Sequence, residues 1–168
     1  MEKYKILFVC LGNICRSPAA QAVMERIVAE RGISMMVEID SAGISGYHEG
    51  DLPDRRMRVH AERRGLRLTH CSRPVRHADF EYFDIIIGMD DANYYDLKEM
   101  AVTLEEEAKV ERISRFFRRY KGQDCIPDPY YGGSEGFENV LDLLDDACNT
   151  IADMIVSGEL FSEYKEKW

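Results

Sequence analysis

Long apolar runs are missing from this sequence, although 45% of its 168 residues are hydrophobic. A helix that spans a membrane needs roughly 18 or more apolar residues in succession, so no such helix is expected. The first apolar stretch, residues 5–9, is a short strand-like run and not the apolar segment of a signal peptide. Both observations favour a cytoplasmic protein.

Paired cysteines and an excess of positive charge are also missing. The five cysteines are an odd number without the spacing of a disulfide scaffold, which suits a reducing compartment. Cysteines and histidines lack the close pairs that a zinc site requires, so we expect no bound metal. The formal net charge of -9 argues against a nucleic acid or an anionic membrane as the partner. The oligomeric state stays open.

Neither a repeat nor a low-complexity linker divides the chain, so one globular domain is predicted over residues 1–157. Residues 158–168 are interpreted as a C-terminal extension, either an exposed helix or a frayed end. Strands are predicted at residues 5–9, 37–39, 84–89 and 109–113, and helices from residue 18 and at 54–64, 91–100 and 134–157. This alternation predicts an α/β fold: a single doubly wound domain with a four-stranded parallel sheet flanked by helices on both faces. Such sheets bind ligands at the carboxyl ends of their strands.

The segment between the first strand and the first helix, residues 10–17, reads Cys-Leu-Gly-Asn-Ile-Cys-Arg-Ser. Ser17 and Pro18 suit the N-cap and the first position of the helix that follows. The unpaired N–H groups and the positive dipole end of a helix N-terminus favour a bound anion. Gly12 allows the backbone to turn inward, and Asn13 tolerates a left-handed conformation. We therefore predict a loop that encloses a tetrahedral oxyanion.

Two side chains of this loop, those of Cys10 and Arg16, indicate which reaction it supports. Cys10 would attack as a thiolate, whereas a free thiol, with a pKa of about 8.5, is mostly protonated at neutral pH. A helix dipole supplies only about 0.3–1 kcal/mol, so loop amides, the Ser17 hydroxyl and the charge of Arg16 must also stabilise the anion. The planar guanidinium of Arg16 can hold two phosphoryl oxygens through the transition state. The pair predicts a cysteine nucleophile under a captured phosphoryl group.

A proton donor for the leaving group has to come from another segment, because in-line attack expels that group on the far side of phosphorus. Asp128 is the candidate, since two prolines stiffen the chain around it and two glycines follow. Tyr130 and Tyr131 would form an aromatic wall for a flat substrate. Protonation by a carboxylic acid assists a departing phenol, whose pKa is about 10, and the same group can then activate water.

Residues 10–17 and the sequence Asp128-Pro129-Tyr130-Tyr131 together resemble the low-molecular-weight protein tyrosine phosphatases over about residues 5–157. The resemblance implies a cysteine nucleophile, a phosphate-clamping arginine and an aspartate that acts as general acid and then base, with no cofactor. It implies a phosphotyrosine-containing protein or peptide as the substrate. The residues concerned are Cys10, Arg16 and Asp128 in catalysis; Leu11, Gly12, Asn13, Ile14, Cys15 and Ser17 around the phosphate; Ser41, His70 and Asp90 in support; and Tyr47, Tyr130 and Tyr131 along the cleft. It also implies that Cys10 and Cys15 could join under oxidation.

Three alternatives stay open. Phosphatases of the same fold that act on phosphoarginine carry threonine at the position of Ile14 and a single aromatic residue after the acid and proline, unlike this chain. Arsenate reductases of this fold need a further close pair of cysteines, and Cys71, Cys125 and Cys148 are widely spaced. A phosphate-binding module without turnover needs no proton donor, so the presence of Asp128 counts against it.

Other polar residues receive simpler interpretations. His48, His60 and His77 are taken as surface or core residues, because a lone histidine is more often structural than functional. The arginines within residues 55–64 are interpreted as a solvated helix face.

Overall fold

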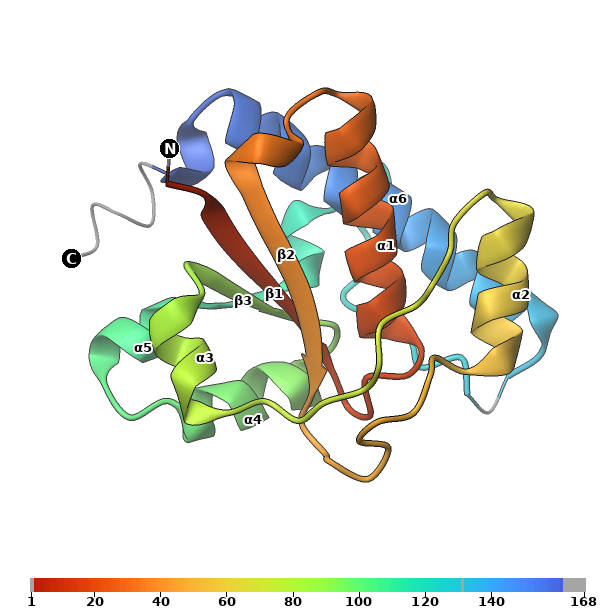
Figure 1. Ribbon diagram of the computed structural model, residues 1–168, viewed down its shortest axis with the longest axis horizontal. Helices are drawn as coiled ribbons and strands as arrows, with labels where there is room; N and C mark the ends of the chain where they lie inside the picture. The colour runs from red at the N-terminus through yellow and green to blue at the C-terminus, as the bar shows by residue number, and fades with distance from the viewer. Residues whose placement is uncertain (1, 131, 162–168) are drawn as a thin grey trace.

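A four-stranded parallel sheet lies between two layers of helices in the computed structural model, which describes residues 2–130 and 132–161 (Figure 1). The strands are Tyr4–Cys10 (β1), Val37–Gly43 (β2), Ile85–Gly88 (β3) and Val110–Arg112 (β4). They lie side by side in the order β2-β1-β3-β4, and every pair is parallel. The central strand β1 is an apolar run buried on both faces, as strands of doubly covered sheets are. The predicted fold class is confirmed.

The two faces of β1 belong to two separate cores, because successive side chains of a strand point to opposite sides. Ile6 and Phe8 pack with helices α1 (Arg16–Glu30) and α6 (Ser134–Val156). Leu7 and Val9 pack on the other face, where α3 (His77–Tyr82) and α4 (Asp91–Met100) supply Phe80 and Leu97. The predicted apolar stripe of α6 is buried throughout: Phe137, Val140, Leu141, Leu144, Cys148, Ile151 and Ile155.

The remaining elements are short and lie around this frame. Helix α2 (Arg55–Arg63) packs against α6, and α5 (Leu104–Ala108) lies next to β4. Two 3-10 turns, Ser34–Met36 (η1) and Ile113–Phe116 (η2), complete the described elements. Elements such as α3 and α5 were not predicted, because five or six residues are too few to reveal a helical period. Within the described residues, no helix combines the length and the apolar character needed to cross a membrane.

The first helix begins at Arg16, earlier than the predicted start at residue 18, and Cys15 is its N-cap. The prediction that Ser17 caps this helix is wrong. Its hydroxyl lies 3.0 Å from the sulfur of Cys10 and accepts a hydrogen bond from the side chain of Asn13. Pro18 is tolerated in the first turn because the N–H groups there have no partner within the helix.

Strand β2 is longer than predicted, since it continues through Asp40 and Ser41 to Gly43. These two polar residues interrupt the apolar pattern, which is why the prediction stopped at residue 39. Ser41 is nevertheless fully buried. A buried hydroxyl requires hydrogen-bond partners, and Ser41 finds them in Asn13, in the loop that follows β1, and in Gln21 of α1.

The end of the described chain packs against its beginning. Leu160 is fully buried, and the ring centroids of Phe161 and Tyr4 are 4.7 Å apart. The extension is therefore neither exposed nor frayed at Leu160, and Phe161, for which the sequence leaves packing against the domain open, does pack against Tyr4. Residues 162–168 lie outside the described residues, and the domain boundary at residue 157 stays a prediction.

Candidate active site

The carboxyl ends of the strands bring separate segments of the chain together, as expected for a parallel sheet. Cys10 is the last residue of β1, and Asp90 follows β3 closely. The carbonyl of Met89 accepts a hydrogen bond of 2.9 Å from the N–H of Ile126, which fixes the segment leading to Asp128 at the same edge.

The phosphate loop, residues 10–17, is held from outside through its carbonyl oxygens. Four donors bond these oxygens: Ile44 N–H to Cys10 at 3.0 Å, Ser45 N–H to Leu11 at 2.9 Å, Ser72 Oγ to Gly12 at 2.9 Å and Asp54 N–H to Ile14 at 2.7 Å. In a trans peptide the N–H points away from the C=O, so carbonyls turned outward leave N–H groups turned inward. No side chain caps the N-terminus of α1, which adds its own free amides. The loop is therefore suited to an anion.

Two positions allow the loop backbone to close tightly. Asn13 has a φ of 57° and is the only non-glycine residue with a positive φ in the described part of the chain. A Cβ on Gly43 would lie 3.0 Å from backbone atoms of Gly12 and Leu11, so any larger residue at the end of β2 would displace the loop. The left-handed conformation predicted for Asn13 is confirmed. Gly12 has no positive φ; a Cβ there would instead lie 3.1 Å from the ring of His48.

The side chain of Asn13 is fully buried and joins the loop to two other segments, β2 and the stretch from His70 to Arg73. Its Nδ2 donates to Ser17 Oγ at 2.8 Å and to Ser41 Oγ at 3.0 Å. Its Oδ1 accepts from the N–H of Arg73 at 3.1 Å and lies 3.0 Å from Nε2 of His70. Because an amide oxygen only accepts, Nε2 of His70 carries the proton in this contact. Ser41 and His70 thus lie behind the loop, where the resemblance implied them.

A second set of polar residues supports this network and was not predicted. Ser41 donates to Gln21 Oε1 at 2.7 Å, and Asp40 lies 3.5 Å from Nδ1 of His70. Arg73 bonds the carboxylate of Asp40 at 3.0 Å. Burial lowers the pKa of His70, although the neighbouring Asp40 carboxylate acts in the opposite direction. A sequence signal existed, because Gln21 and Asp40 are polar residues within otherwise buried helix and strand patterns.

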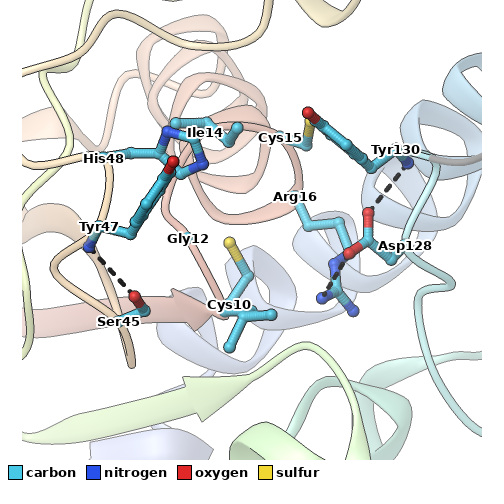
Figure 2. A pocket seen from close by; sticks show the side chains of 11 residues that line it. Cys10, Gly12, Ile14, Cys15, Arg16, Ser45, Tyr47, His48, Asp128 and Tyr130 are labelled. Atoms are coloured by element: carbon cyan, nitrogen blue, oxygen red, sulfur yellow. Dashed lines mark hydrogen bonds and ion pairs between the residues drawn. The ribbon is translucent and has the colours of Figure 1, made fainter.

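Cys10 is 3% exposed, and its sulfur points into the cavity above the loop (Figure 2). The sulfur accepts a hydrogen bond of 3.3 Å from the N–H of Asn13 and lies 3.0 Å from Ser17 Oγ. Donors directed at sulfur stabilise a thiolate relative to a thiol. At the neighbouring Cys15, burial and then the nearby Asp54 carboxylate raise the pKa of the thiol. Both cysteines are free thiols in this structure.

Arg16 is held in place by two acceptors on other segments. Its Nη1 donates to Asp90 Oδ2 at 2.7 Å and to the carbonyl of Ile126 at 2.9 Å. Burial alone would lower the pKa of Arg16, but the sulfur of Cys10 and the carboxylate of Asp90 raise it above its ordinary value. Asp90 also caps α4 by accepting from the N–H of Asn93 at 2.8 Å. The guanidinium is therefore fixed and charged beside the Cys10 sulfur.

Asp128 reaches the same place from the other end of the chain. Its Oδ2 lies 3.7 Å from Nη2 of Arg16, and its side chain is 39% exposed. Its Oδ1 accepts a hydrogen bond of 3.0 Å from the N–H of Tyr130. Tyr131, predicted to line the cleft, lies outside the described residues.

A cavity of about 460 Å³ opens above the loop. Figure 2 shows Tyr47 and His48 on one side of the cavity, Asp128 and Tyr130 on the other, and Cys10 between them. The ring of Tyr47 is 86% exposed, so an apolar substrate ring could cover it. His48 was interpreted as a surface or core residue, and it lies in the cavity wall instead. Its partner Asp51, 3.2 Å from Nδ1, belongs to the same loop, so no periodic pattern revealed it.

Metal ligands do not gather at this site. Among residues 2–130 and 132–161, no group of three or more His, Cys, Asp or Glu side chains is arranged to hold a metal ion. The residues that line the cavity instead include a cysteine, an arginine and an aspartate: Cys10, Arg16 and Asp128.

The fold and the site define a class of protein in which a strand-loop-helix unit forms a loop suited to an anion beside a cysteine. Comparison with known families places the chain more narrowly. The family model described as low molecular weight phosphotyrosine protein phosphatase matches residues 5–160. A human low molecular weight phosphotyrosine protein phosphatase is 40% identical over 136 residues, which are 80% of this chain and 85% of the human protein. The chain belongs to the low molecular weight phosphotyrosine protein phosphatase family.

Solved structures agree with this placement. A protein tyrosine phosphatase from Entamoeba histolytica, crystallised with Hepes in its active site, has a TM-score of 0.90 and 42% sequence identity, with 94% of this chain and 99% of that chain covered. A Drosophila arginine phosphatase has a TM-score of 0.84 and 31% identity, with 90% and 97% covered. The fold is therefore shared by relatives named for two different phosphorylated residues.

Proposed function

We propose that this protein hydrolyses phosphotyrosine in proteins or peptides through a phosphocysteine intermediate. The observation that carries the proposal is that Cys10 and Arg16 of the phosphate loop and Asp128 from a distant segment line one cavity. Their roles in the proposed reaction are nucleophile, phosphate clamp and proton donor.

In the first step the sulfur of Cys10 attacks phosphorus and the bond between phosphorus and the tyrosyl oxygen breaks. Inward N–H groups of the loop and the guanidinium of Arg16 stabilise the charge on the phosphoryl oxygens. Asp128 transfers its proton to the departing oxygen, so that tyrosine leaves as a neutral phenol. The position of Asp128 on the cavity wall, above the loop, supports this role.

In the second step water attacks the phosphocysteine and the sulfur-phosphorus bond breaks. Asp128, now ionised, accepts a proton from the water, and inorganic phosphate leaves. The hydroxyl of Ser17 and the N–H of Asn13 again face the sulfur, and they stabilise the thiolate as it departs. The enzyme returns to its starting protonation state without an external reductant or oxidant.

The walls of the cavity favour an aromatic phosphate ester. The exposed rings of Tyr47 and Tyr130 lie on opposite sides of the cavity, where a flat phenyl ring would fit between them (Figure 2). Contacts between aromatic rings contribute about 0.5–1.5 kcal/mol beyond the area they bury. A phosphoserine side chain would reach the loop without filling this space.

Three proteins test the proposal: the wild type, Cys10→Ser and Asp128→Ala. We measure kcat/KM with phenyl phosphate, which has a poor leaving group, and with 4-nitrophenyl phosphate, which has a good one. Cys10→Ser should abolish turnover of both. Asp128→Ala should reduce kcat/KM by about 10²–10⁴ for phenyl phosphate and by much less for the nitrophenyl ester, because only the poor leaving group needs the proton. Equal losses for both esters would remove Asp128 as the acid.

Matched peptides carrying phosphotyrosine, phosphoserine or phosphoarginine test the substrate. Phosphotyrosine should be turned over fastest. A preference for phosphoarginine would favour the second activity found among relatives of this fold, and the absence of phosphate release from all three would indicate a binding module. Acid quenching during turnover of the phosphotyrosine peptide, followed by peptide mass analysis, should show phosphate on Cys10.

A further inference from the structure

Helix α2 is fastened to the start of α6, the helix that follows the loop of Asp128. The rings of His60 and Phe137 are stacked, with centroids 5.4 Å apart and planes 7° from parallel. Arg64 donates to the carboxylate of Glu138 at 2.8 Å. Cζ of Arg56 lies 4.9 Å from the centroid of Phe137. The interpretation of these arginines as a solvated helix face holds for Arg56, whose side chain is 47% exposed although it contacts Phe137. It holds less well for Arg64, which is half-buried and bonds Glu138 of α6.

On the side of the phosphate loop, the guanidinium of Arg56 is bonded by the carboxylate of Asp54. Nε and Nη2 of Arg56 bond the two carboxylate oxygens of Asp54 at 3.3 and 3.2 Å. Asp54 caps α2 through the N–H groups of Arg56 and Met57, and its own N–H donates to the carbonyl of Ile14 at 2.7 Å. Arg56 is thus connected to the phosphate loop through one residue, Asp54, whose side chain is 12% exposed.

The other side of Arg56 faces the loop of Asp128. Cζ of Arg56 lies 5.3 Å from the centroid of Tyr130, within the range of a cation–π contact. The N–H of Tyr130 in turn donates to Oδ1 of Asp128, so ring and carboxylate belong to one tight turn. Asp128 itself approaches Arg16 at 3.7 Å, too long for a direct hydrogen bond. A contact that locates the Tyr130 ring therefore also locates the carboxylate.

We propose that Arg56 is a positioning residue, which holds the turn of Tyr130 and Asp128 at a fixed place over the phosphate loop. The proposal rests on the function proposed above, in which Asp128 is the proton donor. Arg56 touches neither the phosphoryl group nor the leaving oxygen in this scheme. It acts through Tyr130 on the distance and direction of the proton transfer, and small displacements of a catalytic group have large effects on rate.

The test replaces Arg56 with methionine, which keeps an unbranched stem and removes the guanidinium. We measure kcat/KM with phenyl phosphate and with 4-nitrophenyl phosphate. Arg56→Met should lower kcat/KM for phenyl phosphate about 10-fold and for the nitrophenyl ester no more than about 3-fold, because part of the general-acid contribution is lost. Arg56→Lys, which keeps the charge but not the planar group, should fall between the wild type and Arg56→Met.

Arg55→Met is the matched control. Arg55 is the exposed neighbour on the same helix, and its side chain makes no hydrogen bond or ion pair with any residue that the structure describes. It should retain wild-type kinetics with both esters. Thermal unfolding of each variant identifies any general loss of structure. Such a loss in Arg56→Met would lower kcat/KM for both esters alike, and Arg56→Lys would then be the informative variant.

The double variant Arg56→Met with Asp128→Ala separates positioning from other roles. If Arg56 acts only through Asp128, adding Arg56→Met to Asp128→Ala should change kcat/KM by less than about 2-fold, because no acid is left to position. A further loss in the Asp128→Ala background, or equal losses with the two esters in an Arg56 variant that unfolds at the wild-type temperature, would overturn the inference. If Asp128→Ala alone fails to discriminate between the esters, the proposed acid is wrong and this inference falls with it. Discrimination by Asp128→Ala without discrimination by Arg56→Met overturns the positioning role alone.

Discussion

The phosphate loop and the loop of Asp128 face each other across one cavity but are held in very different ways. Donors from outside bond four carbonyl oxygens of the phosphate loop, and the side chain of Asn13 bonds it to three residues on two other segments. Cys10 and Arg16 are almost fully buried. Asp128 and Tyr130 are 39% and 43% exposed, and the hydrogen bond between them is local.

This difference matches the roles proposed for the phosphate loop and for the loop of Asp128. Stabilising charge on a phosphoryl group requires donors that are in place before the reaction, because reorienting them would cost free energy. A proton donor must instead admit a bulky phosphotyrosine, give up its proton and then meet water. An exposed carboxylate placed by a few contacts suits that sequence of events.

Arg16→Lys should impair binding of the phosphoryl group by the phosphate loop. Lysine keeps the positive charge but cannot bond Asp90 and the Ile126 carbonyl while also presenting a planar pair of donors to phosphate. We expect kcat/KM to fall by about 10²–10³ with either aryl ester. The loss should not depend on the leaving group, in contrast to that of Asp128→Ala. A loss below about 10-fold would show that the loop amides suffice without the guanidinium.

Replacing Asn13 should show how much its hydrogen bonds contribute to the free energy of unfolding. Asn13→Ala removes the buried hydrogen bonds and leaves alanine at a φ of 57°, so the free energy of unfolding should drop by about 2–4 kcal/mol in urea titrations. Asn13→Gly loses the same hydrogen bonds without the backbone strain and should be more stable than Asn13→Ala by about 1 kcal/mol. Asp128→Ala, at an exposed position, should change stability by less than about 0.5 kcal/mol. Similar losses at both positions would contradict the comparison.

The two loop cysteines should differ in their reaction with iodoacetamide. Donors face the sulfur of Cys10, whereas burial and the Asp54 carboxylate raise the pKa of Cys15. Since the thiolate is the reactive form, Cys10 should be alkylated first at neutral pH, and inorganic phosphate should slow its reaction. Cys15 should become reactive only as the pH rises well beyond the ordinary range of a thiol. Peptide mapping by mass spectrometry distinguishes the two sites, and early modification of Cys15 would count against this assignment.

A weak dependence of stability on pH should come from His70. Burial lowers the pKa of His70, so the folded protein binds a proton there less readily than the unfolded chain does. Stability is then complete above about pH 6.5, the ordinary pKa of histidine, and is lost as the pH falls below it. His70→Gln, which keeps a donor for Asn13 and cannot titrate, should flatten this part of the profile of unfolding free energy. A wild-type profile that rises on acidification would have the wrong sign.

Local pattern allowed much of this protein to be predicted. The apolar run before Cys10 gave β1, the residues from Asp91 to Met100 gave α4, and the apolar stripe of α6 is buried as expected. Contacts between segments could not be predicted in the same way. Polarity within a buried pattern marks Gln21, but nothing in the sequence indicates that it bonds Ser41 or that Arg73 bonds Asn13. Nothing near Arg56 indicates the ring of Tyr130. Periodicity reports which side chains are buried and not which partners they meet.

The sequence by itself determined the chemical content of residues 10–17, because a strand, a turn and a helix start that follow one another in the chain place Cys10 and Arg16 close together at little entropic cost. Only the tertiary structure decided where Asp128 lies relative to them, and which side chains hold Asn13 and Tyr130. Those positions depend on closing long stretches of chain over the sheet, and the free energy for that closure comes from packing of the two cores rather than from any local motif.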